Sequence, residues 1–442
     1  MSRLSGPERS VSGPLVGRRV LVAASGSIAA VKTPLLVSAL VRAGAEVRCL
    51  LTPSAARLVS PVALACLSRH RCYQDADQWQ PSEPRPLHIA LAEWAELVIV
   101  APLSATSLAR WTQGLADGLL AGVLLACERP VLAAAAMNTG MWTQAAVRRN
   151  WQQLQADPRV WALDPAAGLL ACDRIGDGRM ASPELIELAA VHALMQADPD
   201  GHLPRDWAGR RLLVSAGPTL EALDPARLIS NRSSGRMGVL LAQAARLRGA
   251  AVTLVHGPLN LPQAWLEGLC CEAVESAVQM GQALEARWPE VDALVMAAAV
   301  ADWRRRGGPA AAKASKETTA SALVGDLELV PDLLATLMHN RRRDQVCLGF
   351  AALSGDDATL QERAAAKIRA KGCDWLFANP IDRPGQGFGE AANGGWLLGL
   401  ERTPGAEPTL ESIPTMDKSL LAHTLLDRLL ERLDQAAMPA GS

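Results

Sequence analysis

The segment Val214–Gly238 combines a strand, a polar loop and the start of a helix in an order typical of phosphate sites. Residues 233–235, Ser-Ser-Gly, lead directly into the helical pattern. Hydroxyls, glycines and the free N–H groups at a helix start form a natural cradle for phosphate. The loop also carries Arg227 and Asn231, a cation and an amide that no apolar core requires. The pattern predicts that this loop, rather than the core, holds the chemistry.

A second set of candidate ligand-binding residues lies in three hydroxyl-rich segments of the first half. Each segment follows a strand-like run: Ser25, Gly26 and Ser27 follow the first run, Thr52 and Ser54 the second, and Ser104, Thr106 and Ser107 the third. One glycine between two serines suits a single phosphate, as in FMN, because a pyrophosphate needs the backbone to approach at several glycines. A tight turn explains the first segment equally well. Three such segments at the carboxyl ends of strands nevertheless favour a ligand site.

Three single residues in the first half could act on a substrate, and each also has an ordinary structural explanation. His88 precedes a short helical run, and a lone histidine is about as often structural as functional. Asn138 follows a buried strand, where it could cap a helix or donate to a carboxylate. Cys172 lies in Leu169–Met180, whose glycines predict a flexible loop. A loop cysteine near a ligand can donate a proton. On the chemistry of the residue alone, however, we favour a structural role over a catalytic one.

The second half contains candidates of lower specificity. Ala297–Asp302 follows a strand, and its small side chains would let a planar ring lie against the backbone, although helix packing explains them too. Lys313 and Lys316 lie in Arg304–Ser321, which lacks apolar periodicity and predicts a mobile loop. These lysines could neutralise a triphosphate or could simply be solvated. The remaining candidates are a strand-end aromatic residue and two lysines one helical turn apart, a spacing usual on a solvated face: Phe350, Lys367 and Lys371.

The composition describes a globular protein of more than one domain. The chain has 442 residues, of which 49% are hydrophobic and 20% are charged, which predicts two or three packed domains. The net charge of −1 provides no overall attraction to nucleic acid or to an anionic membrane. The nine cysteines include no C-x-x-C pair, which predicts free thiols in a reducing compartment. No signal peptide or membrane-spanning pattern is apparent, so we expect a cytoplasmic protein.

Strands alternate with helices in both halves, which predicts two doubly wound, mostly parallel α/β sheets of Rossmann-like type. The expected strands are Arg19–Ala23, Glu46–Leu51, Leu97–Ala101 and Val131–Ala135 in the first half, and Arg211–Ala216, Ala251–His256, Asp292–Ala298, Val346–Ala351 and Asp374–Ala378 in the second. The expected helices include Ile28–Arg42, Ser104–Trp111, Leu119–Cys127, Pro183–Met195, Met237–Arg248, Ala277–Trp288, Leu360–Lys371 and Met416–Leu433. The segment 198–208, rich in proline, glycine and charge, predicts a linker between domains at 17–197 and 209–435.

Several longer segments occur in an order that matches a known family. They are SGSIAAVKTP (25–34), HIALAEWAELVIVAP (88–102), AAMNTGMW (135–142), GRM (178–180), and AGPT with LDPARLISNRSSGRMG (216–238). Together they resemble the bifunctional phosphopantothenoylcysteine decarboxylase and phosphopantothenate–cysteine ligase of bacterial coenzyme A synthesis, over residues 17–434. The resemblance implies a flavodoxin-like flavoprotein domain followed by a ligase domain.

For the ligase half, the resemblance implies that the carboxylate of 4′-phosphopantothenate attacks CTP to form an acyl-cytidylate. The amine of cysteine then displaces CMP. Asn231 matches the residue that holds the acyl-cytidylate, Arg227 assists nearby, and Lys313 neutralises the phosphates together with Mg²⁺. The positions that match the family's CTP site are Ala298, Asp302, Pro331, Asp332, Phe350, Lys367 and Lys371.

For the decarboxylase half, the resemblance implies FMN as cofactor, held by the three hydroxyl-rich segments. Direct loss of CO₂ would leave an unstabilised carbanion, and FMN avoids it by oxidising the thiol side to a thioaldehyde. His88 matches the active-site histidine, Asn138 the amide that grips the carboxylate, and Cys172 the proton donor for the final reduction. The resemblance also implies a homo-oligomer, with trimeric flavin halves and dimeric ligase halves, whose partners are small-molecule substrates rather than nucleic acid or a membrane.

The chain departs from the family pattern mainly around the nucleotide. In the first half, Asp173-Arg174 follow Cys172 in place of Gly-Asp. The departures in the second half are Ser315 where basic residues are common, Val330 in place of Asn before Pro331-Asp332, Leu353 in place of Glu after GFAA, and Pro380 in place of Asp after Asn379. The nucleotide preference is therefore open, and no metal ligands are predicted. Two alternatives also stay open: a flavin decarboxylase with an inactive ligase half, and a non-catalytic flavoprotein subunit that regulates a phosphatase.

Overall fold

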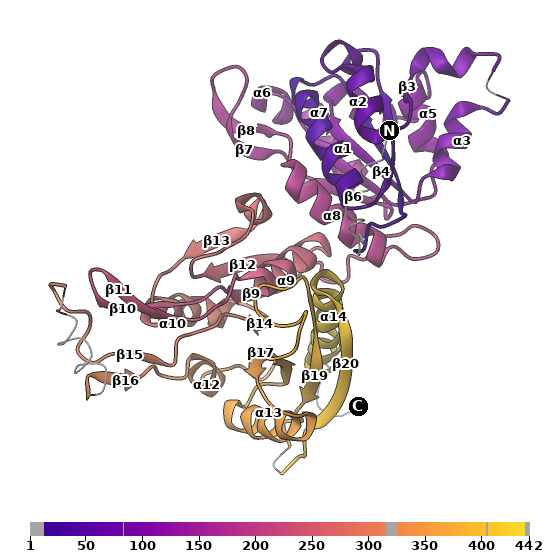
Figure 1. The fold of residues 1–442 in the computed structure, drawn as a ribbon. Coiled ribbons are helices and arrows are strands. Elements are labelled where there is room, and N and C mark those ends of the chain that lie inside the picture. The colour runs from indigo at the N-terminus through magenta and orange to yellow at the C-terminus, as the bar shows by residue number, and fades with distance from the viewer. Residues whose placement is uncertain (1–12, 83, 314, 316–324, 404, 438–442) are drawn as a thin grey trace, which may run out of the picture. The chain divides into compact units, whose positions relative to one another are not determined.

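The computed structural model describes residues 13–82, 84–313, 315, 325–403 and 405–437. The chain forms two compact units, Met1–Pro204 and Arg205–Ser442, and the boundary between them falls inside the segment 198–208. Each unit contains its own large sheet with helices packed against it (Figure 1). The two doubly wound, mostly parallel α/β sheets expected from the sequence are confirmed.

Six parallel strands form the sheet of the first unit, in the order β3-β2-β1-β4-β5-β6. They are β1 (Arg19–Ala24), β2 (Glu46–Leu51), β3 (Cys72–Gln74), β4 (Leu97–Leu103), β5 (Val131–Ala135) and β6 (Val160–Leu163). Every residue of β4 is buried, as expected for a parallel strand that is covered on both faces. The strand order reverses between β1 and β4, so a crevice that can bind a ligand opens at their carboxyl ends.

The helices of the first unit are α1 (Thr33–Arg42), α2 (Pro61–Ser68), α3 (Leu87–Trp94), α4 (Ala105–Thr112), α5 (Leu119–Ala126), α6 (Thr139–Trp142), α7 (Ala145–Gln155) and α8 (Pro183–Gln196). The single helix expected at Ile28–Arg42 is divided in two. A 3₁₀ turn at Ile28–Lys32, capped by Ser27, precedes α1. The division follows from Pro34, which is tolerated in the first turn of a helix but not in its interior.

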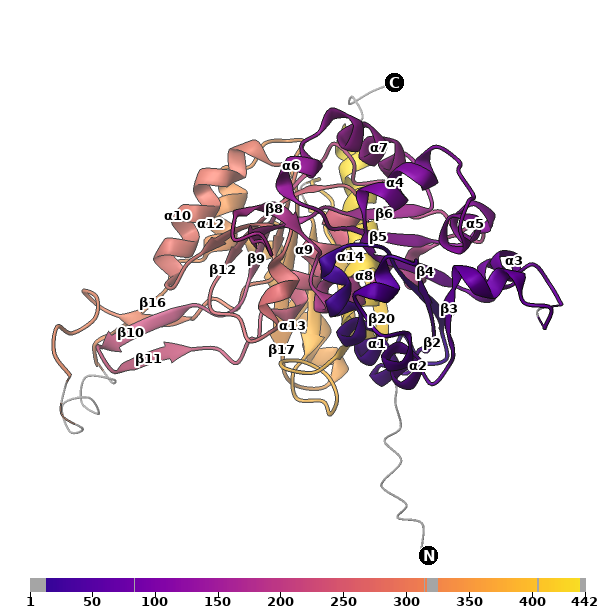
Figure 2. The same cartoon turned by 90° about the horizontal axis from the view of Figure 1, so that it is seen from above.

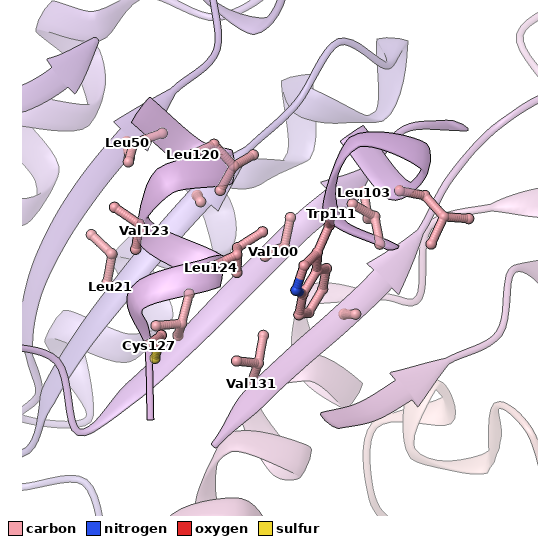
Figure 3. Packing of buried hydrophobic residues seen from close by; sticks show 14 of the residues in the cluster. Leu21, Leu50, Val100, Leu103, Trp111, Leu120, Val123, Leu124, Cys127 and Val131 are labelled. Atoms are coloured by element: carbon pink, nitrogen blue, oxygen red, sulfur yellow. The ribbon is translucent and has the colours of Figure 1, made fainter. Parts of the chain in front are cut away.

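Helix α5 packs on one face of this sheet through apolar side chains. Val123 and Leu124 of α5 lie against Leu21 and Val100 of the sheet (Figure 3). The sequence of α5 is apolar almost all round because α3 and α4 also pack against it. A Cβ atom at Gly122 would lie 3.2 Å from Cβ of His88, so this glycine lets α3 approach closely.

The segment Leu169–Met180 is not the flexible loop that its glycines suggested. It contributes to an antiparallel hairpin of β7 (Ala166–Leu169) and β8 (Ile175–Arg179), with Cys172 in the turn. The glycines serve close packing instead, because a Cβ atom at Gly178 would lie 2.3 Å from the carbonyl oxygen of Met137. The backbone N–H of Met137 also donates to the Gly178 carbonyl at 3.1 Å, which ties the hairpin to the end of β5.

Eight strands form the main sheet of the second unit, in the order β13-β12-β9-β14-β17-β18-β19-β20. They are β9 (Arg211–Ala216), β12 (Ala251–His256), β13 (Cys270–Ala273), β14 (Ala293–Met296), β17 (Val346–Leu353), β18 (Trp375–Pro380), β19 (Ala392–Gly399) and β20 (Thr409–Asp417). The first six in this order are parallel, and β19 and β20 extend the sheet with antiparallel pairs that the sequence did not predict. As in the first unit, the strand order reverses at the strand that comes first in the chain. Here β12 lies on one side of β9 and the later strand β14 lies on the other.

The helices of the second unit are α9 (Arg236–Leu247), α10 (Ala277–Arg287), α12 (Leu333–His339), α13 (Asp357–Lys371) and α14 (Lys418–Ala437). The last helix begins two residues later than expected because Met416 and Asp417 still belong to β20. The Asp417 carboxylate accepts the N–H of Ser419 at 2.7 Å and satisfies a donor of the first helical turn.

Two short hairpins extend from the second sheet in both views (Figures 1 and 2). They are β10 (Leu220–Asp224) with β11 (Arg227–Ser230), and β15 (Trp303–Arg305) with β16 (Leu327–Leu329). The long loop expected after β9 is therefore a hairpin, closed by the Asp224 carboxylate, which accepts the N–H groups of Ala226 and Arg227. The mobile loop expected at Arg304–Ser321 begins as strand β15, and Lys316 lies outside the described residues.

The second unit contains a buried carboxylate, Asp374, whose side chain has no exposed surface. It accepts from Arg341 at 3.1 Å, from Arg402 at 2.7 Å and from the backbone N–H of Cys347 at 2.9 Å. Replacing Asp374 by leucine should destabilise this unit by about 3 kcal/mol, because both guanidinium groups lose their shared partner. Thermal unfolding should show a transition lowered by roughly 6–12 °C, whereas alanine at the exposed Asp344 should change it little. An unchanged transition for Asp374→Leu would contradict this account.

All nine cysteines are free thiols, as expected. In the part of the chain that the structure describes, no helix has both the length and the apolar character needed to cross a membrane.

Candidate active sites

A cavity of about 540 Å³ lies in the second unit at the carboxyl ends of β14, β17 and β18 and beside the start of α9. Eight residues singled out from the sequence line it: Asn231, Ala298, Asp302, Pro331, Asp332, Phe350, Lys367 and Lys371. They come from segments more than a hundred residues apart, which the parallel sheet brings to one edge.

One wall of this cavity is the small-residue segment that follows β14. The hydroxyl of Ser215 accepts the N–H of Ala298 at 3.1 Å, and the hydroxyl of Thr219 accepts the N–H of Ala301 at 3.0 Å. The Asn231 amide donates to the carbonyl groups of Ala299 and Val300 at 3.2 and 3.0 Å. These bonds fix the backbone of the wall and hold Asn231 against it.

The start of α9 forms the neighbouring wall and depends on two glycines. Gly235 has φ of +78°, a left-handed conformation that admits few other residues. A Cβ atom at Gly238 would lie 2.6 Å from Cβ of Ala216, so this glycine lets α9 lie directly on β9. The first turn of α9 thereby presents its unpaired N–H groups at the strand ends, and their use as a phosphate cradle stays a prediction.

The lysines of α13 lie on the cavity rather than on a purely solvated face. Lys367 and Lys371 both line it, and the ammonium of Lys371 forms an ion pair with Asp332. Asp332 also caps α12 by accepting the N–H of Ala335 at 3.1 Å. The Asp332 carboxylate is thus engaged by the protein, whereas no hydrogen bond or ion pair to another described residue involves the Asp302 side chain.

Two residues that we expected near the nucleotide, Arg227 and Lys313, do not line this cavity. Arg227 lies on β11, where it forms an ion pair with Asp224 at 3.6 Å. Lys313 is exposed and lies outside the lining. Their roles therefore stay predictions.

The sequence missed four polar residues of this cavity: Arg236, Asn379, Asn393 and Lys418. Arg236 directly follows the Ser-Ser-Gly turn, a position that could have identified it. Asn379 lies in a family motif, where only the following Pro380 was considered. Asn393 and Lys418 had no local signal, because only the folded sheet brings β19 and α14 to the same edge as α9.

A second cavity, about 440 Å³, lies in the first unit and contains two of its expected catalytic residues. Asn138 and Cys172 line it together with Ser27, Lys32, Arg179 and Met180. The Asn138 amide nitrogen donates to the sulfur of Cys172 at 3.2 Å, while its oxygen accepts the N–H of Gly140 at 2.8 Å and caps α6. The β7–β8 hairpin thus brings an exposed thiol onto an amide that is 34 residues away in the chain.

The three hydroxyl-rich segments lie side by side, since β2, β1 and β4 are neighbours in the sheet. Ser25 is fully buried, and its hydroxyl donates to the Pro102 carbonyl at 2.9 Å and accepts the Ser104 N–H at 2.7 Å. A Cβ atom at Gly26 would lie 2.6 Å from Cβ of Ser54, so the first two segments touch only because residue 26 is glycine. Ser25 therefore joins β1 to β4.

The remaining hydroxyl residues fall into two groups. Thr52 and Ser107 line a cavity of about 30 Å³ that also includes Asp75 and Arg110. Ser104 caps α4, whereas Thr106 is exposed. Their assignment to a cofactor stays a prediction.

His88 lies on α3 against α5 and lines neither cavity of the first unit. Within one chain, the structure therefore brings together Asn138 and Cys172 but not the third residue expected to act with them.

Comparison with known proteins identifies the family. The family model described as "DNA/pantothenate metabolism flavoprotein C-terminal domain" matches residues 207–433, and the model described as "Flavoprotein" matches residues 8–194. The coenzyme A biosynthesis bifunctional protein CoaBC of Bacillus subtilis is 37% identical over 86% of this chain and 90% of that protein. The chain belongs to the CoaBC family. It is accordingly a bifunctional enzyme of coenzyme A biosynthesis with a flavoprotein domain.

Other CoaBC relatives match along almost the whole chain. The protein from Mycobacterium bovis is 37% identical over 94% of this chain and 97% of its own length. Among solved structures, the C-terminal domain of a CoaBC protein is 28% identical, with a TM-score of 0.40, and covers 52% of this chain and 99% of that domain. Membership of the CoaBC family excludes the non-catalytic flavoprotein subunit left open above.

Proposed function

We propose that the second unit joins cysteine to 4′-phosphopantothenate with CTP, and that the first unit decarboxylates the product, 4′-phosphopantothenoylcysteine, with FMN. The contact between Asn138 and Cys172 carries the proposal for the first unit. The carbon atom that loses CO₂ must afterwards receive a proton. The group that binds the carboxylate and the group that delivers the proton must therefore reach the same carbon, and a separation of 3.2 Å meets that requirement.

The residues of the first unit suit FMN. The hydroxyls of Thr52 and Ser107 share one cavity, where they and the unpaired N–H groups at the start of α4 would offer donors for one phosphate. The Ser27 hydroxyl lines the cavity of Asn138 and Cys172 and would face another part of the cofactor. Bound FMN would supply two-electron oxidation and reduction of the substrate thiol. Asn138 would orient the carboxylate by donating from its amide, and Cys172 would provide the proton.

In the second unit, the cavity walls suit an activated carboxylate. Asn231 and the backbone of the small-residue wall would hold the acyl-cytidylate, and the lysines of α13 would compensate its charge. Mg²⁺ would arrive with CTP, and Asp302 is the carboxylate best placed to face it, because Asp332 already pairs with Lys371.

We further propose that the sites are completed by other copies of this chain, with trimeric flavin halves and dimeric ligase halves in the cytoplasm. Exposed apolar side chains support this proposal: Ile28, Val31 and Leu35 of the first unit are 53–63% exposed, and Leu228, Trp303 and Leu329 on the two hairpins are 49–68% exposed. The positions of His88, Arg227 and Lys313 outside the cavities of their own chain agree with it.

Mixing two inactive variants tests whether the flavin site is shared between chains. His88→Asn and Asn138→Asp should each lower decarboxylation at least about 100-fold, the usual effect of losing a proton-transfer or binding group. Re-assembling the two proteins together should restore part of the activity, because some sites would then receive both native residues. Mixtures that stay as inactive as the single variants would contradict a shared site.

The combined activity is tested with purified protein, FMN, 4′-phosphopantothenate, cysteine and CTP. We expect CMP and CO₂ to be released in equal amounts. CO₂ release from added 4′-phosphopantothenoylcysteine without any CTP-dependent CMP release would instead support the flavin decarboxylase with an inactive ligase half.

A further inference from the structure

Lys418, the first residue of α14, is a buried lysine that the chemistry described above does not use. It is only 4% exposed, although it lines the cavity of the second unit together with Asn379 and Asn393, which are also buried. Lysine is almost never buried to this degree unless it is paired. Across the described ranges, no carboxylate forms an ion pair with Lys418, so its place in the cavity needs a functional explanation.

The side-chain nitrogen of Lys418 is held by two backbone carbonyl groups. It donates to the carbonyl oxygens of Gly387 and Glu390 at 2.8 and 2.7 Å. These two contacts and the Cε atom occupy three of the four tetrahedral directions of the nitrogen. The fourth direction holds a third hydrogen when the lysine is charged and a lone pair when it is neutral. Two N–H groups therefore satisfy both carbonyl groups in either state, and the fourth position is left for a ligand.

The surroundings of Lys418 favour its neutral form. Burial is the main cause, and the nearby charge of Arg236 acts in the same direction. The other charged groups around it, Glu390 and Asp417, act in the opposite direction without offsetting this effect. The pKa of Lys418 is thereby lowered to about 8, so part of the lysine carries a free lone pair near neutral pH, as a general base requires.

Two buried amides offer donors in the same cavity. The side-chain oxygen of Asn393 accepts the N–H of Gly394 at 3.1 Å, while no hydrogen bond between described residues uses its amide nitrogen. The side chain of Asn379 forms no hydrogen bond with another described residue. Because amide N–H groups readily donate to a carboxylate, these two side chains can bind the carboxyl group of an amino acid.

The fold brings both amides close to the start of α14. The backbone N–H of Lys418 donates to the Ala391 carbonyl at 3.0 Å, two residues before Asn393 on β19. The neighbouring strand β18 carries Asn379, whose Cα would lie 3.1 Å from a Cβ atom at Gly395 of β19. The amine of an α-amino acid is only two bonds from its carboxyl carbon, so a carboxylate held by the amides would place the amine near Lys418.

We infer that Lys418 accepts a proton from the amine of cysteine as this amine attacks the acyl-cytidylate, while Asn379 and Asn393 hold the cysteine carboxylate. This inference rests on the proposed ligase function and assigns the proton acceptor of its second step. Of the carboxylates that line the cavity, Asp332 pairs with Lys371, and Asp302 is the one proposed to face Mg²⁺. Lys418 is the buried base that remains.

The proton transfer belongs to the formation of the amide bond. Cysteine in solution carries an ammonium group, which gives one proton to water before the nitrogen can attack. The nitrogen then bonds to the carbonyl carbon of the acyl-cytidylate, the bond from that carbon to the phosphate oxygen breaks, and CMP leaves with the electron pair. The nitrogen gives its second proton to the lone pair of Lys418, which passes it to water after the products leave.

Two substitutions keep the donors of Lys418 but cannot accept a proton. Arginine stays charged, and glutamine offers two N–H groups without a basic nitrogen. Lys418→Arg and Lys418→Gln should each lower the rate of amide formation at saturating cysteine at least about 100-fold. Exchange of labelled pyrophosphate into CTP, which needs 4′-phosphopantothenate but no cysteine, should stay within about threefold of the unmodified protein.

Two further variants test the specificity of this effect. Arg428→Gln removes a charge on the same helix that is paired with Glu411, and it should leave both reactions unchanged. Asn393→Asp keeps the acceptor for Gly394 but would repel the cysteine carboxylate. The KM for cysteine should therefore rise at least about tenfold in Asn393→Asp, while the KM for CTP stays within about twofold.

Hydroxylamine distinguishes a proton acceptor from a lysine that only supports the fold. It is an uncharged nucleophile at neutral pH and loses a proton readily once it has bonded to carbon, so it needs little help from a base. CMP release with hydroxylamine in place of cysteine should therefore stay within about threefold of the unmodified protein in both Lys418 variants. A structural defect would slow the reaction with either nucleophile.

Normal amide formation in Lys418→Gln and Lys418→Arg would overturn the inference, as would an equal loss with cysteine and with hydroxylamine. If the larger arginine side chain abolishes pyrophosphate exchange, Lys418→Gln decides. Loss of exchange in both variants would also count against the inference, because Lys418 would then serve the activation step or the fold. Absence of pyrophosphate exchange in the unmodified protein would refute the proposed ligase function instead.

Discussion

Cys172→Ser is expected to lower formation of the decarboxylated thiol product at least about 100-fold. Serine can occupy the turn of the β7–β8 hairpin without disturbing the backbone, since Cys172 is exposed. Its hydroxyl is a far weaker acid than a thiol, so the proton needed at the carbon that lost CO₂ would arrive slowly. The substrate should therefore lose CO₂ about once for each site and then stall as an unsaturated thiol.

The measurement compares CO₂ with thiol product in a single-turnover reaction of FMN-loaded protein. Cys66→Ser, at another exposed cysteine of the first unit, serves as the matched control and should turn over normally. Normal amounts of the saturated aminoethanethiol product from Cys172→Ser would remove Cys172 from the mechanism.

Asn231→Asp should lower ligation of cysteine by about 100-fold or more, as is usual when a donor at a developing charge is lost. The side chain keeps its size, but both donors to the carbonyl groups of Ala299 and Val300 disappear. The introduced carboxylate would repel those carbonyl oxygens and also the anionic substrates. Decarboxylation of added 4′-phosphopantothenoylcysteine should be unchanged, because that reaction belongs to the other unit.

CMP release and amide formation should be measured separately for this variant. Asn340→Asp makes the same chemical change at an exposed position that ends α12 and should leave both unchanged. Coupling of cysteine at the normal rate in Asn231→Asp would show that the contacts of this amide do not matter to the ligase.

The parallel core was predictable from the sequence because its strands are short apolar runs between turn residues. Glu46–Leu51, Val131–Ala135, Arg211–Ala216 and Ala251–His256 form strands with the expected bounds. Strand β20 was not predicted, because Ile413 is its only buried residue and it contains Pro414, which sheets admit mainly in edge strands such as this one. The β7–β8 hairpin was missed because its glycines serve packing against Met137 rather than flexibility.

The residues of a candidate site were predictable where one segment of the sequence carries the chemistry. They were not predictable where the site depends on contacts between segments that are far apart in the sequence. Asn231 and the small-residue wall could be read from their own segments. Lys418 could not, because the first residue of a helix is normally solvated, whereas here it is buried and donates to the distant carbonyl groups of Gly387 and Glu390. His88, Arg227 and Lys313 show the opposite case, since each lies in a matching motif but lines none of the three cavities described above.

The most direct test of the central claim, consecutive reactions in two separate units, is a time course of CMP and CO₂ from one preparation. With FMN, 4′-phosphopantothenate, cysteine and CTP present, CMP should appear first and CO₂ should follow in equal final amount. Omitting CTP should abolish both, unless 4′-phosphopantothenoylcysteine is added, which should restore CO₂ alone. CO₂ released from 4′-phosphopantothenate and cysteine without CTP, or CMP released without any CO₂, would contradict the account.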